Sequence, residues 1–504
     1  MAQSNFSNQR PPPLKKRPNI ILCVADQLRP FEMGCYGQAG ISTPNLDRLA
    51  ADGVRFETAV SNFPVCMAAR SVLLSGQSNR TCTGGVSNVS FSSLPSRPGL
   101  PDPFDKFNMP EYPYPNRPHL PQPTLAELLR DSGYRTAAIG KWHVHSWPDD
   151  VGFDNYLIPR VHHCHVGQSF VGNTENGGQE FVPPGFSVDF EAQRVGEFFQ
   201  QAQAKAQAQA QDKNPPEPFF LYYNISPPHC PFADLPEKYL AMYRPGDVAL
   251  RPNVNPDKQL ERQDHWFKVY RYDFRYYSLH LPYTRTLPEG YSLRHLIAEY
   301  WGATTCVDDT VGRMLAALEA AGLADNTIVI FTADHGDNLG SHGLVQKGGP
   351  NEESARIPLL VRWPGGLGSG RVVRGHVASL VDVAPTIMDV IGGKPPEHWH
   401  GQSLAPLLRG DSRRPGISEI NSAIIETSDG VGVRSPSCLY YLPFDKTKAR
   451  AKTRKLARQP SQFYDLAADP YQLHNLADTD AAGQTRQELH ERLMEWDRDT
   501  PWMP

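Results

Sequence analysis

The sequence predicts an α/β fold with a large, mostly parallel sheet flanked by helices, followed by a smaller C-terminal α+β domain. Short apolar runs alternate along the chain with longer segments of helical periodicity, which is the pattern of strand–helix–strand units. The apolar runs are continuous rather than alternating, as expected for strands that are buried on both faces. After about residue 410 the pattern changes to short strand-like pieces and one last helix.

Five apolar runs are predicted as strands of the large sheet. The first, NIILCVA, covers residues 19–25 and ends at Asp26. The later ones are residues 135–139, 219–225, 327–332 and 358–361. Helices are expected between and after the strands, at residues 45–51, 124–132, 192–212, 293–321 and 485–498. The run rich in Ala and Gln near residue 205 favours a solvated helix.

The predicted organisation has three parts. Residues 1–18 form a flexible N-terminal segment, residues 19–410 form the main domain with the active site, and residues 411–504 form the small C-terminal domain. Residues 91–123 are rich in Pro, Ser and Asn and are interpreted as a long loop that borders a site. Residues 255–289 are dense in Tyr, Arg and Trp and are interpreted as an insertion, which together with the loop 91–123 is expected to line the pocket for the leaving group.

The bulk composition excludes several classes of partner. The formal net charge of −4 gives no basic excess that would attract nucleic acid or an anionic membrane. The apolar runs are too short to span a bilayer, and the N-terminus lacks the apolar segment of a signal peptide. The eight cysteines show no paired spacing. We therefore expect a cytoplasmic protein without a disulfide framework, the alternative being one from which a leader has been removed.

Polar side chains directly follow two of the predicted strands. Asp26 and Gln27 follow the first strand, and Asp334 and His335 follow the strand at residues 327–332. Ligands of open α/β sheets lie at the carboxyl ends of strands, so these groups could together hold one divalent cation. Carboxylate and amide oxygens suit Ca²⁺ or Mg²⁺, and the imidazole admits Mn²⁺. Either pair alone is equally well explained as a helix N-cap.

Cys66 lies in the segment FPVCMAARS, directly before a segment of helical pattern. A cysteine at a helix N-terminus has a lowered pKa and lies where anions bind. For Cys66 taken alone, the alternative is a small buried core residue.

Cys66, Ala68 and Arg70 carry a specific resemblance. Cys66-x-Ala68-x-Arg70 is similar to the sulfatase signature Cys-x-Pro-x-Arg except at its middle position. Further segments resemble blocks of that family in the family's order: PNIILCVADQ, STPNLDRLAADGVRFETAVSNFPVC, GKWHVH, ISPPHCPF, FTADHGDNLGSHGLVQK, EESARIPLLVRWPG and QFYDLAADPYQLHNLA. Over nearly its whole length, the chain therefore resembles the sulfatases of the alkaline phosphatase-like superfamily.

The resemblance implies a formylglycine-dependent sulfuric ester hydrolase. In the family a maturation enzyme converts the signature cysteine, here Cys66, to formylglycine. One hydroxyl of the hydrated aldehyde attacks sulfur, the alcohol leaves, and the second hydroxyl expels sulfate by C–O cleavage. One divalent cation, Ca²⁺ first and Mn²⁺ or Mg²⁺ as alternatives, lowers the pKa of the attacking hydroxyl. The implied metal ligands are Asp26, Gln27, formylglycine at position 66, Asp334 and His335.

The resemblance also assigns roles to cationic and imidazole side chains. Arg70 would steady the formylglycine and the metal ligands. Lys141 would bind the sulfate, and His143 would be the base that collapses the sulfated intermediate. His229 would contact the oxygen that leads to the leaving group. Lys347 would do the same and help to protonate the departing alcohol.

Two departures from the family pattern leave alternatives open. Ala68 replaces the signature proline that the maturation enzyme reads. Gln27 replaces a frequent second Asp, and the Asp-Gln start also resembles phosphonate monoester hydrolases and choline sulfatases. The favoured substrate is a small sugar, aryl or alkyl sulfate. The alternatives are a phosphonate monoester or phosphodiester hydrolase, and a catalytically silent homologue that binds anions with Cys66 unmodified.

Two further features remain hypotheses at this point. The segment HHCH at residues 162–165 fits the usual zinc spacings poorly, so a loop of the substrate pocket is favoured over a second metal site. The insertion at residues 255–289 has the Tyr and Arg content of surfaces that self-associate, which indicates a homo-oligomer.

Overall fold

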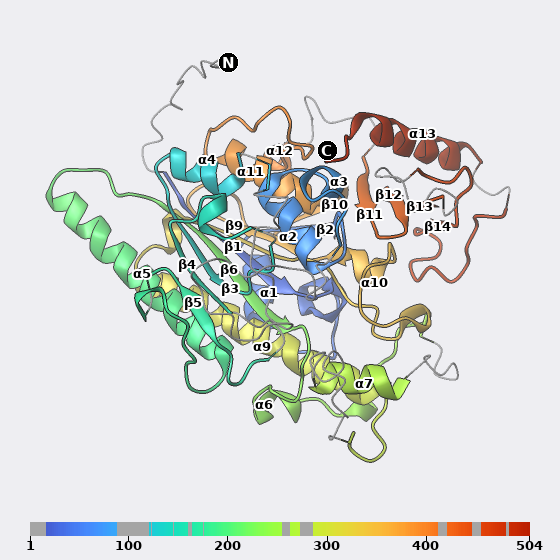
Figure 1. Ribbon diagram of the computed structural model, residues 1–504, viewed down its shortest axis with the longest axis horizontal. Coiled ribbons are helices and arrows are strands. Elements are labelled where there is room, and N and C mark those ends of the chain that lie inside the picture. The colour runs from blue at the N-terminus through green and yellow to red at the C-terminus, as the bar shows by residue number, and fades with distance from the viewer. Residues whose placement is uncertain are drawn as a thin grey trace.

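The computed structural model describes the chain except for residues 1–16, 88–119, 122, 145, 160–163, 175, 255–262, 273–285, 412–420, 446–454, 480–482 and 504. Most of the predicted segment 1–18, of the loop 91–123 and of the insertion 255–289 therefore lies outside the described residues. Figure 1 shows a large unit that contains the N-terminal part of the chain and a smaller unit at the C-terminal end.

The large unit is built on a ten-stranded sheet with the order β10-β2-β9-β7-β1-β6-β3-β4-β5, in which the short β8 also pairs with β2. The strands are β1 (Asn19–Asp26), β2 (Val54–Val60), β3 (Arg135–Gly140), β4 (Asn155–Pro159), β5 (Phe170–Gly172), β6 (Phe219–Pro228), β7 (Thr327–Ala333), β8 (Arg356–Ile357), β9 (Leu359–Arg362) and β10 (Arg371–Ser379). Strands β7, β1, β6, β3 and β4 run parallel, which confirms the predicted sheet type.

The central strands bring their carboxyl ends to one edge. Every residue of β1, β6 and β7 is buried, as their continuous apolar sequences predict. Ala25 pairs with Ala333 of β7 and with Ile225 of β6, so the three strands end together. The side chains that follow Ala25 and Ala333 therefore start as neighbours.

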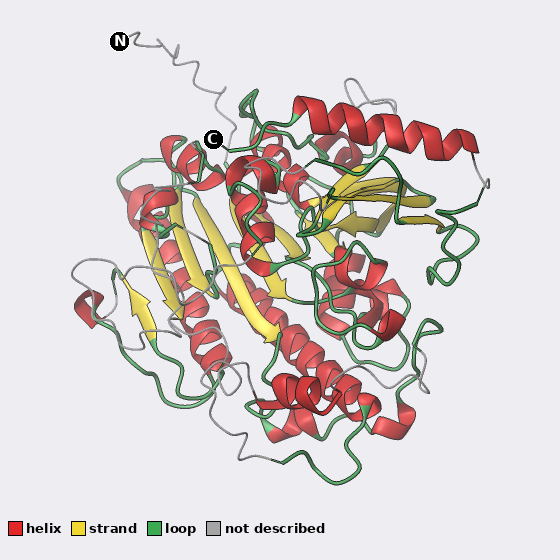
Figure 2. Ribbon diagram, turned by 45° about the vertical axis from the view of Figure 1, so that its right-hand side comes forward, coloured by secondary structure: helices red, strands yellow, loops and turns green. Residues whose placement is uncertain are grey.

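Helices cover both faces of the sheet (Figure 1, Figure 2). Helices α5 and α9 pack on each other and on β3 and β6, whereas α2 packs on α4 and α11. The helices of the large unit are α1 (Pro44–Ala51), α2 (Cys66–Ser75), α3 (Asn79–Cys82), α4 (Leu125–Asp131), α5 (Ser187–Gln211), α6 (Glu237–Leu240), α7 (Gln263–Tyr272), α9 (Leu293–Ala320), α10 (Glu352–Ala355), α11 (Val383–Val390) and α12 (Ala405–Arg409). None of the helices in the described ranges is long and apolar enough to cross a lipid bilayer.

Strands β2, β4, β5, β8 and β10 were not predicted, and two further features of the large unit differ from the prediction. Helix α5 begins at Ser187, five residues before the predicted start at residue 192, because Val188, Val195 and Phe199 bury its first half against the body of the unit. The predicted strand at residues 358–361 is present as β9, but it runs antiparallel to both of its neighbours. A buried apolar run of four residues carries no information about its direction.

The small unit is a four-stranded antiparallel sheet covered by one helix. Its strands are β11 (Ala423–Glu426), β12 (Gly430–Arg434), β13 (Cys438–Pro443) and β14 (Gln462–Asp465), and its helix is α13 (Gly483–Asp499). Leu489, Leu493 and Trp496 of α13 pack on Val431 and Val433 of β12. This arrangement confirms the α+β character predicted for the C-terminal part, while the boundary at residue 410 stays a prediction.

A buried ion pair joins the two units. Arg434 of β12 donates to both carboxylate oxygens of Glu352 in α10, at 2.7 Å and 3.1 Å. Gln472 adds a third link by accepting from the Glu352 main-chain N–H at 2.9 Å. Burial alone would raise the pKa of Glu352, but the charges of Arg434 and Arg356 outweigh it and lower the pKa to about 2.

Glu352→Gln is expected to reduce stability by about 2–3 kcal/mol at pH 7, because a carboxylate with a lowered pKa stabilises the folded state when it is ionised. This stabilisation is complete above about pH 5, the range in which an unfolded Glu is ionised, and is lost as the pH falls toward about 2. The difference in urea midpoint between wild type and variant should therefore shrink between pH 6 and pH 3.5. Equal differences at both pH values would contradict this assignment.

Glu397→Gln is the matched control for that comparison. Glu397 pairs with Lys394 at 3.1 Å, but both side chains are more than four-fifths exposed. Exposed pairs contribute little to stability. The control should leave the urea midpoint unchanged at every pH.

Candidate active site

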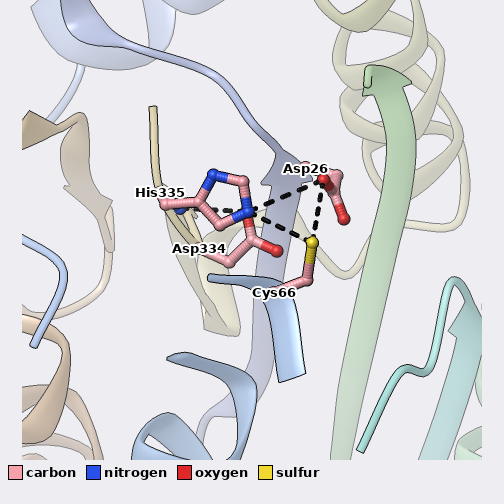
Figure 3. A group of neighbouring side chains, drawn as sticks. All are labelled: Asp26, Cys66, Asp334 and His335. Carbon is pink, nitrogen blue, oxygen red and sulfur yellow. Dashed lines mark hydrogen bonds and ion pairs between the residues drawn. The ribbon is translucent and has the colours of Figure 1, made fainter. Parts of the chain in front are cut away.

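Four ligand-type side chains converge at the carboxyl edge of the sheet (Figure 3). One ligand atom from each of Asp26, Cys66, Asp334 and His335 lies within 4.8 Å of the others, and all four residues are buried. Among the described residues this is the one group of three or more such side chains close enough to share an ion. The structure thus brings together the strand-end residues and the signature cysteine.

The main chain after each strand sets the directions of these groups. Asp334 Oδ1 accepts from the main-chain N–H groups of Gln27 at 3.0 Å and His335 at 2.9 Å. Gln27 has a φ of 66°, in the left-handed region that side chains other than glycine rarely adopt. His335 Nδ1 lies 2.8 Å from the Gly336 carbonyl, so Nδ1 carries a proton, and in the neutral ring Nε2 has the lone pair that can bind a metal ion. This Nε2 faces Cys66 Sγ at 3.2 Å.

Cys66 is the first residue of α2 and is surrounded by charge. Lys347 Nζ lies 3.0 Å from the sulfur, and the sulfur lies 3.7 Å from Asp26 Oδ1. Burial and Asp26 alone would raise the pKa of the thiol, but the cationic Lys141 and Lys347 outweigh them and lower it to about 6. The site therefore stabilises negative charge on the atom attached to Cβ of residue 66.

Arg70 joins the ends of β1 and β7. It lies one helical turn after Cys66 on the same face of α2. Its guanidinium donates to Asp26 Oδ2 and to Asp334 Oδ2, both at 3.0 Å, and to Asn224 Oδ1 at 2.5 Å. Arg70 is fully buried, so these two carboxylates and the arginine depend on one another for charge balance.

Lys141 and His143 follow β3. Lys141 Nζ lies 2.6 Å from Asp26 Oδ2, and both side chains are fully buried. Burial alone would raise the pKa of Asp26, but Lys141, His229 and Arg70 outweigh it and hold the pKa well below its usual range. Burial lowers the pKa of His143, and the charges of Lys141 and Arg70 lower it further. A neutral His143 therefore lies beside cationic groups.

His229 follows β6 and is also buried. Its Nδ1 lies 2.7 Å from the Cys230 carbonyl, which fixes the ring and leaves Nε2 as its other polar atom. Its influence on the pKa of Asp26 places it within electrostatic range of the cluster. Each of the metal-binding and catalytic side chains that the resemblance implies is thus in this site or acts on it electrostatically.

The donor set fits a divalent cation. Asp26, Gln27, Asp334 and His335 offer three oxygen ligands and one imidazole nitrogen, a set that suits a hard ion. Burial and the neighbouring Asp26 raise the pKa of Asp334. A cation between the two carboxylates would offset their mutual repulsion and the cost of burying their charges, and would keep both ionised.

Sequence reasoning missed four polar side chains of the site. They are Asn224, which accepts from Arg70; Tyr300, which donates to the Gln27 carbonyl at 2.6 Å; Asp337; and Tyr270, which donates to Asp337 at 2.7 Å. Asp337 could have been found, because it lies in the same FTADHGD segment as Asp334. Tyr270 and Tyr300 lie on helices far along the chain, where spacing gives no signal. Of the HHCH segment, Cys164 and His165 are buried and residues 162 and 163 lie outside the described ranges.

Comparison with known proteins gives a consistent family. A family model described as Sulfatase matches residues 18–393. N-acetylglucosamine-6-O-sulfatase of Bacteroides thetaiotaomicron is 29% identical over 448 residues, which cover 79% of this chain and 72% of that protein. Arylsulfatase of Clostridium perfringens is 26% identical over 490 residues, which cover 92% of this chain and 91% of that protein.

Solved structures agree on the fold. A protein in complex with its substrate D-glucosamine-2-N,6-O-disulfate superposes with a TM-score of 0.70 at 22% identity, covering 96% of this chain and 98% of that one. The phosphonate monoester hydrolase of Agrobacterium radiobacter superposes with a TM-score of 0.64 at 22% identity, covering 96% of both chains. At this level of identity the likeness concerns the fold.

Proposed function

Because the chain belongs to the sulfatase family and is a sulfuric ester hydrolase, we propose that it cleaves sulfate monoesters with a formylglycine formed from Cys66 and one divalent cation. The observation that carries the proposal is the position of Cys66. Its Sγ lies beside Lys347 and His335, at the end of the sheet where Asp26 and Asp334 meet. A nucleophile at this point is surrounded by groups that favour its anionic form.

Conversion of Cys66 is compatible with Ala68. The first main-chain hydrogen bond of α2 runs from the Ala69 N–H to the Val65 carbonyl. The N–H of Ala68 precedes it and belongs to the helix-terminal groups that lack an intrahelical acceptor. A proline and an alanine therefore both fit this turn without loss of a main-chain hydrogen bond of α2.

The hydrated aldehyde at position 66 supplies both steps of the reaction. One hydroxyl attacks sulfur and the alcohol leaves. The second hydroxyl then gives up its proton to His143, sulfate departs with cleavage of the C–O bond, and the aldehyde forms again. The lowered pKa of His143 supports this assignment, because a base must be unprotonated to accept a proton.

The remaining side chains hold ligands and charge. Asp26, Gln27, Asp334, His335 and residue 66 would hold the cation, with Ca²⁺ proposed from the oxygen-rich set. When bound, a divalent cation lowers the pKa of the attacking hydroxyl and holds sulfate oxygens. Lys141 binds the sulfate, His229 and Lys347 contact the oxygen of the leaving group, and Arg70 fixes the carboxylates.

We propose a sulfated sugar as the natural substrate class. The support is the N-acetylglucosamine-6-O-sulfatase relative and the structural neighbour that holds a sulfated glucosamine. Aryl sulfates are the convenient model substrates, as the arylsulfatase relative indicates. The proposed partner in maturation is a formylglycine-generating enzyme. The cytoplasmic location and the homo-oligomer stay predictions.

The substrate preference is tested with esters that share one leaving group. We expect 4-nitrophenyl sulfate to be hydrolysed with a higher kcat/KM than bis(4-nitrophenyl) phosphate and 4-nitrophenyl phenylphosphonate. The measurement is the release of 4-nitrophenol by protein with a known fraction of converted Cys66. A higher kcat/KM for the phosphonate would overturn the sulfatase assignment in favour of the alternative below.

The phosphonate monoester or phosphodiester alternative has one specific observation in its favour. Gln27 stands where a second carboxylate would make the site more negative, and the phosphonate monoester hydrolase shares the fold. A phosphonate monoester and a phosphodiester carry one negative charge, as a sulfate monoester does, so this site could bind any of the three. The third alternative, a silent homologue, would show no change in behaviour when Cys66 is replaced.

A further inference from the structure

Gln27 has every polar atom engaged. Its main-chain N–H donates to Asp334, and its carbonyl accepts from Tyr300 Oη at 2.6 Å. Its side-chain Oε1 accepts from Lys347 Nζ at 2.7 Å, and its Nε2 donates to Asp337 Oδ2. The amide is thus held from two sides, by a donor next to Cys66 and by an acceptor on the opposite side.

Asp337 determines the orientation of the Gln27 side-chain amide. Its Oδ1 accepts from the Leu339 N–H at 2.9 Å, and both oxygens lie within 2.9 Å of Tyr270 Oη. Together with Gln27 Nε2, three donors surround this buried carboxylate, which matches the acceptor-only character of its ionised form. A flipped amide would turn Oε1 of Gln27 toward Asp337 and Nε2 toward Lys347, and both contacts would be lost.

Tyr270 connects this carboxylate to the loop that carries Lys347. Its hydroxyl donates to Asp337 and accepts from the main-chain N–H of Gln346 at 2.7 Å. Tyr270 is fully buried and belongs to α7, in the insertion that the sequence assigned to the substrate pocket. One phenol therefore restrains the two residues, Gln27 and Lys347, whose polar atoms meet beside Cys66.

From these contacts we infer that Asp337 and Tyr270 are positioning residues that hold the Gln27 amide with its oxygen toward the cation site and hold Lys347 beside residue 66. The inference rests on the proposed function, since it needs a cation between Asp26 and Asp334. It also accounts for the amide at position 27. A carboxylate there would face the buried Asp337 carboxylate at hydrogen-bond distance, and like charges at that distance disfavour each other strongly.

A donor–acceptor swap tests this arrangement. Gln27→Glu places an acceptor against the acceptor Asp337. Asp337→Asn replaces one of the two accepting oxygens with an NH₂ group, so that the side chain at position 337 faces a donor with a donor, at either Gln27 or Leu339. Each single change should weaken Ca²⁺ binding by about 10- to 100-fold, as is typical for partners of metal ligands. The double variant Gln27→Glu/Asp337→Asn restores one donor and one acceptor with the wild-type net charge. It should recover Ca²⁺ affinity to within about tenfold of wild type.

The measurement is calorimetric titration of Ca²⁺ into the full chain, produced with a maturation enzyme and stripped of metal with a chelator. The rise in melting temperature on adding Ca²⁺ is a second readout that does not depend on turnover. Recovery in the double variant supports the inference. Affinity losses that simply add in the double variant overturn it.

Tyr270→Phe, which removes one hydroxyl, is the variant that tests the inference if the Asp337 variants fold poorly. It should weaken Ca²⁺ binding several-fold and lower kcat more than it raises KM. The reason is that the loop carrying Lys347 loses the hydrogen bond from the Gln346 N–H to the phenol. Tyr239→Phe is the matched control, since Tyr239 donates to Asp309 at 2.8 Å in a contact between α6 and α9. Equal Ca²⁺ affinity in the two variants overturns the inference. A wild-type chain that binds none of Ca²⁺, Mn²⁺ and Mg²⁺ would remove the proposed cation itself, which is a different result.

Discussion

Cys66→Ala is expected to lower kcat/KM for a sulfate monoester by about 10⁴-fold or more, because the variant has no atom from which the nucleophile can be formed. Its melting temperature should fall no further than that of the control described below, since both changes remove one buried side-chain sulfur. The measurement is turnover of 4-nitrophenyl sulfate by wild type and variant at equal concentration.

Cys306→Ala is the matched control for this loss. Cys306 is fully buried in α9, and burial raises the pKa of its thiol to about 12, so it has no reactive thiolate. The control should lose some stability and keep its kcat. Full activity of Cys66→Ala would show that another group attacks the ester and would remove the basis of the proposed mechanism.

Arg70→Met is expected to reduce both stability and turnover. The substitution leaves Asp26 and Asp334 buried without the guanidinium that bonds to both, and removal of one partner of a buried charge pair typically costs about 3–5 kcal/mol. Turnover should fall by about 10³-fold, because the carboxylates that would hold the cation are no longer aligned. Urea unfolding and the sulfate assay measure the two effects.

Two comparisons make the Arg70 result specific. Arg70→Lys keeps the charge but lacks the planar guanidinium that reaches both carboxylates and Asn224 from separate nitrogens, so it should recover part of the stability and little of the activity. Arg244→Met removes an arginine from an exposed pair with Asp247 and should change neither. An Arg70→Met variant as stable and active as Arg244→Met would contradict the role given to this side chain.

The part of the site that the sequence predicts is the part determined by local geometry. Asp26 and Asp334 follow apolar runs that pair in parallel register, so the strand ends alone place them together. Cys66 and Arg70 are four residues apart on one helix, and this spacing puts them on one face. Local pattern and the family resemblance agree at these positions.

The part that the sequence misses depends on contacts between distant segments. Tyr270 reaches Asp337 from an insertion whose composition predicts a pocket wall but no particular partner. Strand β10, which lies at the edge of the sheet, was missed because its sequence, RVVRGHVAS, interrupts the apolar pattern with charged residues and a glycine. Its inner half is nevertheless buried and pairs with β2. Such pairings follow from the tertiary fold and leave no periodic signal.

The central claim is that residue 66 is a formylglycine, and the mass of one peptide tests it most directly. Trypsin cleavage after Arg55 and Arg70 releases residues 56–70, which contain Cys66 and Ala68. From protein produced with a formylglycine-generating enzyme, we expect the mass of the aldehyde or its hydrate in place of that of the thiol. A peptide that carries only the unmodified thiol, from protein that nevertheless hydrolyses a sulfate ester, would contradict the account.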